Sequence, residues 1–144
     1  MTAIRQILCA TDLSPASQPA WEEARLLARV LGAELMLLRV LPPFPIPPEG
    51  YFPPHLYQEP AEGAEREAQA SLDGWLAKLG DPTVTARSRL VEGSAAPRIL
   101  DVVREEGSDL VVVGTHGRSG LGRVVRFLEG SELWASTPAP WTLR

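Results

Sequence analysis

The stretch DLVVVGTHGRSGLG, residues 109–122, decides the fold class of this chain. Its run Leu110-Val111-Val112-Val113 is short, continuous and mostly β-branched, which is typical of a strand buried on both faces of a parallel sheet. The strand leads directly into a segment with glycines at 114, 117, 120 and 122. Because glycine has no Cβ, the backbone there can turn sharply and approach a ligand closely. A glycine-rich loop in this place indicates a phosphate-binding loop, and a turn without a ligand is the alternative.

Length and composition indicate one globular domain over residues 1–144, with 44% hydrophobic and 22% charged residues. A net charge of −4 gives no indication that the protein binds nucleic acid or an anionic membrane, both of which attract positively charged proteins. No apolar run approaches the roughly 20 residues that span a bilayer, so we expect no membrane segment. The single cysteine, Cys9, excludes an internal disulfide and fits a cytoplasmic protein. Its place inside a predicted strand favours a small buried hydrophobe over a nucleophile.

Apolar periodicity predicts strands that alternate with helices along the chain. Strands are expected at residues 6–10, 34–41, 84–91, 110–113 and 141–143. Helices are expected up to residue 31, where Gly32 ends a helix capped by Ser14 or Ser17, and at residues 61–78, 95–106 and 123–137. Residues 41–60 hold eight of the fourteen prolines, which predicts a long extended loop.

This alternation predicts an α/β protein, a three-layer α/β/α sandwich around a five-stranded, mainly parallel sheet of order 3-2-1-4-5. This order places the topological switch point between strands one and four, where open sheets bind ligands. Thr11 and Asp12 at the end of strand one would face residues 114–117 at the end of strand four. A carboxylate beside an anion-binding loop suggests a nucleotide, with Asp12 accepting from the base or ribose and the loop holding phosphates. Asp12 as a turn or helix-capping residue is the alternative.

In this order and spacing, three segments resemble the universal stress protein family. ILCATDLSPAS (7–17) is similar to the family's first strand and helix start, and LGAELMLLRVL (31–41) to its second strand. VEGSAAPRILDVVREEGSDLVVVGTHGRSGLGRVV (91–125) is similar to its third strand through its phosphate loop. The resemblance implies an adenine nucleotide alpha hydrolase-like fold and a homodimer formed through the C-terminal strand. It also implies a division into members that bind ATP and members that do not.

The family's ATP-binding pattern is Gly, two residues, Gly, nine residues, then Gly with Ser or Thr. Gly114 and Gly117 match its first half, but nine further residues lead to Phe127-Leu128. Phenylalanine prevents close backbone approach, and leucine has no hydroxyl to donate. Gly130-Ser131 lies three residues late and would need a bulge in the loop. Both alignments remain open.

The function predicted from these features is an ATP-binding regulatory module of the stress response, with slow or no hydrolysis. Magnesium would arrive on the bound ATP, and neither a metal site nor a catalytic residue is predicted. The alternative is a dimeric scaffold that has lost ATP binding at Phe127-Leu128. A nucleotidyl hydrolase on the same fold is a third possibility, but it lacks a visible general base.

Candidate nucleotide-binding residues lie at the strand ends, in the glycine-rich loop and at the late Gly-Ser pair. Val40 would form an apolar wall for the base, or serve simply as a core residue. Arg118, Arg123 and Arg126 would neutralise phosphates, or form a solvated helix face. The complete candidate set is Ala10, Thr11, Asp12, Val40, Val113, Gly114, His116, Gly117, Arg118, Gly130 and Ser131.

Overall fold

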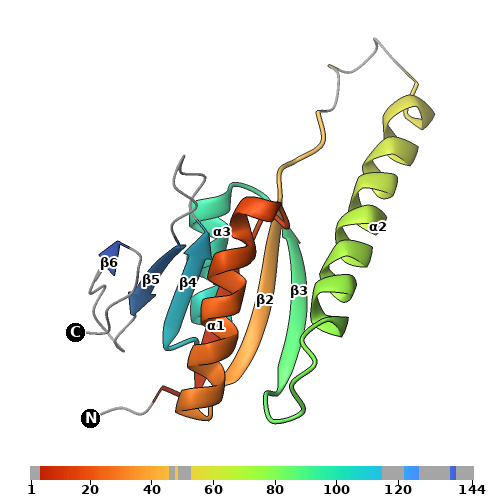
Figure 1. The fold of residues 1–144 in the computed structure, drawn as a ribbon. Coiled ribbons are helices and arrows are strands. Elements are labelled where there is room, and N and C mark those ends of the chain that lie inside the picture. Colours follow the sequence, from red (N-terminus) through yellow and green to blue (C-terminus); the bar gives the residue numbers. More distant parts are fainter. Residues whose placement is uncertain (1–3, 46–47, 49–52, 115–121, 127–136, 139–144) are drawn as a thin grey trace.

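Helices and strands alternate along most of the chain in the computed structural model, which describes residues 4–45, 48, 53–114, 122–126 and 137–138 (Figure 1). Within these residues no helix is both long and apolar enough to cross a membrane. In chain order the elements are β1 (Gln6–Ala10), η1 (Pro15–Ser17), α1 (Gln18–Leu31), β2 (Glu34–Leu41), α2 (His55–Ala77), β3 (Ala86–Glu92), α3 (Ala95–Glu106), β4 (Leu110–Gly114), β5 (Gly122–Arg126) and β6 (Thr137–Pro138).

The strands form one sheet of order β3-β2-β1-β4-β5-β6. β1 to β4 are parallel, with Ile7 of β1 in register with Leu35 of β2 and Leu110 of β4. The predicted order 3-2-1-4 is therefore confirmed, and so is the topological switch point between β1 and β4, where the order of strands along the sheet changes sides. The predicted β3 is displaced, since it begins at Ala86 rather than residue 84 and ends at Glu92.

The prediction of a helix over residues 123–137 is wrong at both ends, since residues 123–126 belong to β5 and Thr137 belongs to β6. Residues Gly122–Arg126 form β5, which pairs antiparallel with β4 and places Gly122 opposite Gly114. β6 adds a sixth strand, so the prediction of five strands is also wrong. The sequence of β5, GRVVR, is too short to show a helical or strand period, and its two valines favour a strand once β4 lies alongside. The predicted strand at 141–143 lies outside the described residues.

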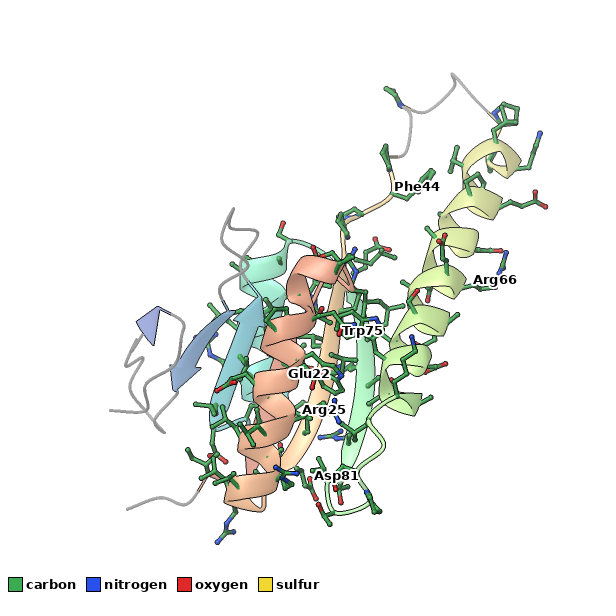
Figure 2. All side chains as sticks on the ribbon, in the orientation of Figure 1. Glu22, Arg25, Phe44, Arg66, Trp75 and Asp81 are labelled. Carbon is green, nitrogen blue, oxygen red and sulfur yellow. The ribbon has the colours of Figure 1, made fainter. Side chains whose placement is uncertain are left out.

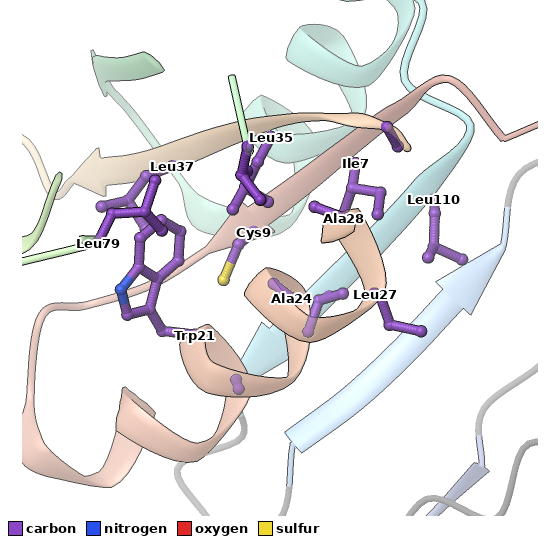
Figure 3. Packing of buried hydrophobic residues seen from close by; sticks show 14 of the residues in the cluster. Ile7, Cys9, Trp21, Ala24, Leu27, Ala28, Leu35, Leu37, Leu79 and Leu110 are labelled. Carbon is purple, nitrogen blue, oxygen red and sulfur yellow. The ribbon is translucent and has the colours of Figure 1, made fainter. Parts of the chain in front are cut away.

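Apolar side chains fill both faces of the sheet. On one face Ile7 and Cys9 of β1 pack against Trp21, Ala24 and further buried residues of α1 (Figure 3). On the other face Leu8 and Ala10 of β1 belong to a cluster with Val102 and Val103 of α3. The two clusters confirm three layers, with α1 and α2 on one side of the sheet and α3 on the other (Figure 1).

Cys9 is completely buried and unpaired. Burial raises the pKa of its thiol to about 12, so the group stays protonated at neutral pH. The prediction that Cys9 is a small buried hydrophobe is confirmed.

α1 begins and ends at the residues that the sequence indicates. Ser17 occupies the N-cap position, with Pro19 in the first turn, where proline is tolerated. At the other end Gly32 adopts a left-handed conformation with φ of 64°, and its amide donates to the Ala28 carbonyl. A side chain at this φ is strained, which explains why the helix ends at a glycine.

α2 begins at His55, six residues earlier than predicted, so the proline-rich loop is shorter than expected. Pro60 lies inside the helix and has no amide hydrogen to donate to the carbonyl of Leu56. Only Ala68 and Leu72 of this helix are buried. The N-terminal half of α2 extends past the carboxyl ends of β2 and β3 (Figure 1).

Two contacts join α2 to α1. The rings of Trp21 and Trp75 lie 6.4 Å apart between centroids, and Trp75 is on the side of α2 that faces α1 (Figure 2). Arg25 of α1 donates to the Leu79 carbonyl at 2.6 Å, just beyond the end of α2, and pairs with Glu22 at 2.8 Å. The C-terminal half of α2 is thus attached to the body of the protein by packing and by hydrogen bonding.

Leu72 provides the first test of this arrangement, because its side chain is fully buried between α2 and the sheet. Leu72→Ala should lower the free energy of unfolding by about 2–5 kcal/mol through lost burial and a residual cavity. Leu56→Ala in the same helix is the matched control, since Leu56 is 52% exposed, and it should change stability by no more than about 0.5 kcal/mol. Urea unfolding followed by circular dichroism measures both, and equal losses would contradict the packing of α2.

Candidate functional site

The candidate site lies at the carboxyl edge of the sheet, where β1 ends between its two neighbours. Ala10 is in register with Leu38 of β2 on one side and Val113 of β4 on the other. The Thr11 amide continues the pairing by donating to the Leu38 carbonyl at 2.9 Å. Since β2 and β4 flank β1, the segments that follow β1 and β4 leave the sheet at adjacent points.

Asp12 organises the turn between β1 and α1. Its Oδ1 accepts from the Ser14 amide at 2.9 Å and from the Ser14 hydroxyl at 2.6 Å, and it also accepts from the Ser17 hydroxyl. Leu13, between the two ends of this turn, has a φ of 63°, which is uncommon for a residue other than glycine. The carboxylate therefore holds a constrained turn, as expected for the turn reading of Asp12.

The two serines were predicted as helix caps, and this is wrong for their side chains. Ser17 occupies the N-cap position of α1, but its side chain makes no capping bond to the helix amides. Both hydroxyls instead donate to Asp12. The spacing Asp-x-Ser-x-x-Ser carries this signal, because an aspartate readily accepts from the residue two positions later.

Thr11 adds a second local bond at the same place. Its Oγ1 accepts from the Leu13 amide at 3.0 Å, and Thr11 itself is buried. Two successive side chains thus satisfy backbone amides of one short turn. These local hydrogen bonds hold Thr11 and Asp12 in place in the absence of a ligand. Such preorganisation lowers the entropic cost of binding a ligand at the end of β1.

The predicted apolar residues of the site share one face of the sheet. Ala10, Val40 and Val113 all belong to the cluster beneath α3. Ala10 and Val40 are buried, and Val113 at the end of β4 is partly exposed. Val40 is therefore a core residue that also lies at the carboxyl edge of the sheet.

Gly114 is the last residue of β4, and its pairing with Gly122 joins the two ends of the glycine-rich segment. Residues 115–121 between them lie outside the described residues, and so do residues 127–136. The structure consequently places six of the eleven predicted site residues near one edge and describes none of His116, Gly117, Arg118, Gly130 and Ser131. Within the described parts of the chain, no group of three or more His, Cys, Asp or Glu side chains could hold a metal ion.

Asp12 provides the second test. Asp12→Ala should lower the free energy of unfolding by about 1–3 kcal/mol, because Ser14 and Ser17 lose their common acceptor. Asp12→Asn keeps a carbonyl oxygen at the same position and should lose less than half as much. Chemical denaturation of the two variants beside the wild type measures the difference. Equal stability of the alanine variant and the wild type would show that the turn does not depend on this carboxylate.

Comparison with known proteins gives one consistent answer. Residues 3–131 match the sequence model described as "Universal stress protein family". The chain is 28% identical over 121 residues to universal stress protein A homolog 1 of Coxiella burnetii, covering 84% of this chain and 83% of that protein. It is 31% identical to universal stress protein YxiE of Bacillus subtilis, covering 81% and 82% of the two chains.

A solved structure agrees with these matches. A protein of the universal stress protein family from Burkholderia pseudomallei superposes with a TM-score of 0.65 and 31% identity, covering 81% of this chain and 85% of the other. The match of the family over most of the sequence, together with the four parallel strands in the predicted order, shows that this chain belongs to the universal stress protein family.

Proposed function

We propose that this protein binds ATP at the carboxyl edge of β1 and β4 and acts as a regulatory module of the stress response, with slow or no hydrolysis. The observation that supports this most is the juxtaposition of two features at the topological switch point between β1 and β4. One is the constrained Thr11-Asp12 turn, and the other is the glycine-rich segment whose ends, Gly114 and Gly122, are paired. ATP is proposed as the nucleotide because the chain belongs to the universal stress protein family, whose resemblance implies that some members bind ATP.

The residues present fit the parts of a nucleotide. Val40 and Val113 offer apolar contact at the edge, suited to a base, and Asp12 offers an acceptor for the base or the ribose. Glycines 114, 117, 120 and 122 permit backbone amides to approach phosphates. Magnesium carried by the nucleotide would neutralise phosphate charge, so the chain needs no metal cage of its own.

β5 changes how phosphate charge would be balanced. A glycine-rich loop that opens into a helix offers the helix N-terminus to an anion, but the segment after this loop is a strand. Register places Arg123 opposite Val113, beside the end of β4, and Arg126 opposite Leu110, at the start of β4. These positions are about 10 Å apart along the strand. Arg123 is therefore the proposed cation of the site, and Arg126 is a matched control on the same strand.

Titration calorimetry with ATP and AMP tests the function and this assignment together. We expect wild-type protein to bind ATP, and Arg123→Met to weaken ATP binding by roughly tenfold to a hundredfold through loss of one charged contact, worth about 1.5–3 kcal/mol. Arg126→Met should bind ATP like the wild type. Absence of nucleotide binding in all three proteins would favour the alternative, a scaffold without a nucleotide site. Equal loss in both variants would contradict the role of Arg123 alone.

Phe127-Leu128 allows a second test of the site. If this pair occupies the family's Gly-Ser position, ATP should have little advantage over AMP, because the loss falls at the distal phosphates. Phe127→Gly with Leu128→Ser should then strengthen ATP binding by about 1–3 kcal/mol and leave AMP binding unchanged. Ser131→Ala separates the two alignments: weaker ATP binding in this variant, with no gain from the double change, would identify Gly130-Ser131 as the phosphate contact.

We also propose that the protein is a cytoplasmic homodimer that uses its C-terminal segment. The buried thiol of Cys9 needs no oxidising compartment, and an edge strand with unpaired amides and carbonyls favours addition of a second chain. Sedimentation at micromolar concentration shows whether the protein is a dimer.

A further inference from the structure

The outward face of α1 presents apolar side chains to solvent. Val30 is 69% exposed and Leu26 is 44% exposed, and they lie one helical turn apart, so they form one continuous patch. Ala24 is completely buried and lies about 160° around the helix from Leu26, at 3.6 residues per turn. The patch therefore points away from the sheet. Contiguous exposed apolar side chains are a feature of protein–protein contact sites.

α2 lies beside α1 without covering this face (Figure 2). It contacts α1 through the rings of Trp21 and Trp75, and through Arg25, which donates to the Leu79 carbonyl. Leu26 lies about 140° around the helix from Trp21 and about 100° from Arg25, so it is on the side away from α2. The face of α1 that carries Leu26 is therefore open toward solvent.

Charged residues of opposite sign lie on either side of Leu26 along α1. Glu22 lies about 6 Å before Leu26 along the helix axis, and Arg29 lies about 4.5 Å after it, at 1.5 Å per residue. Both residues are exposed. They lie on the same flank of the helix, about 20° apart around its axis. The order along this face is therefore acidic, apolar, basic.

This order is self-complementary about a two-fold axis. When two copies of α1 lie antiparallel with Leu26 against Leu26, Arg29 of each copy comes opposite Glu22 of the other, because their distances from Leu26 differ by about 1.5 Å. Both contacts form together, since a two-fold interface uses the same patch on each copy. Val30 lies on the other flank and extends the apolar contact. We infer that the outward face of α1 binds the same face of a second copy of this chain, with Leu26 at the centre.

Glu22 is already held in position for this contact. Arg25 of the same helix donates to both of its carboxylate oxygens, at 2.8 and 3.0 Å, while the Glu22 side chain stays 57% exposed. A carboxylate has about four lone-pair sites, so it can accept from a second arginine as well. The negative charge is thus fixed beside Leu26 before a second copy binds, which lowers the entropic cost of association.

The contact is small and therefore weak. Each copy offers one face of a single 14-residue helix, and interfaces that bury less than about 1,200 Å² belong to transient complexes. We expect a dissociation constant on the order of 100 μM. The inference rests on α1 alone, so it depends neither on the proposed nucleotide site nor on the proposed contact of the C-terminal segment.

Sedimentation equilibrium of the full-length chain, from about 10 μM to about 1 mM, tests the contact. We expect the average mass of wild-type protein to rise with concentration in this range. Leu26→Arg should weaken the association by about tenfold or more, because it places two like charges at the centre of the interface. Leu56→Arg is the matched control, since Leu56 is an exposed leucine on α2, and it should associate like the wild type.

Charge reversal identifies the surface that each copy contacts. Arg29→Glu brings two acidic residues together and Glu22→Arg brings two basic residues together, so each variant alone should associate about tenfold more weakly than the wild type. In an equal mixture of the two variants, glutamate again meets arginine, and the mixed pair should associate within about twofold of the wild type. Arg66→Glu is the control, because Arg66 is an exposed arginine on α2, and it should change nothing.

Three results would overturn the inference. One is a mass that stays constant up to about 1 mM, because the patch would then not bind its own copy. Another is association that persists unchanged in Leu26→Arg, since a different surface would then make it. The third is a mixture of the two charge-reversal variants that associates no better than either alone. Circular dichroism of each variant shows that a loss of association is not a loss of folding.

Discussion

Burial of β1 on both faces is the constraint on which the rest of the structure depends. Leu8 and Cys9 are completely shielded from solvent, on opposite sides of the sheet. A strand with no polar face must have helices above and below it and strands on both sides. The chain meets this demand with β2 on one side, β4 on the other, α1 across one face and α3 across the other. The carboxyl end of β1 is consequently the place where the segments that follow β1 and β4 leave the sheet side by side.

Asp12, at the carboxyl end of β1, has an observed structural role and a proposed role in binding. Asp12 holds the turn into α1 through three hydroxyl or amide donors, and the proposed ligand would meet the same residue. A site built on a turn that the fold itself requires is rigid, which lowers the entropic cost of binding. It also means that substitutions of Asp12 affect stability and binding together, so binding data on such variants need a stability measurement beside them.

The two edges of the sheet differ in how they are protected. At β3, Arg87 and Arg89 pair with Glu106, and Arg89 also pairs with Glu105, at 2.6–2.9 Å. The hydrogen bond to Glu105 raises the pKa of Arg89, and the bond from Arg87 lowers the pKa of Glu106. These pairs join α3 to the edge strand, and charged side chains on an edge discourage another strand from adding. The opposite edge, at β6, is the one from which the C-terminal residues continue, and self-association is proposed there for that reason.

The sequence by itself determined the central part of this protein. Continuous apolar runs predicted β1, β2 and β4, and helical periodicity with Gly32 as a stop predicted the end of α1. These signals are local, because the pattern of apolar residues within the segment itself shows which faces of a strand or helix are buried. The carboxyl edge, with Thr11 and Asp12 directly after β1 and Gly114 at the end of β4, followed from the order of those elements.

Only the tertiary structure decided the remaining features, each of which depends on a neighbour distant in sequence. α2 starts at His55 and includes Pro60, although proline there removes a hydrogen bond, and packing of Leu72 and Trp75 on the body holds the later turns. Residues 122–126 form a strand because β4 offers a complete row of backbone partners. The short pattern GRVVR is compatible with either state, and pairing with β4 selects the strand because it satisfies amides and carbonyls that a short isolated segment would leave to water.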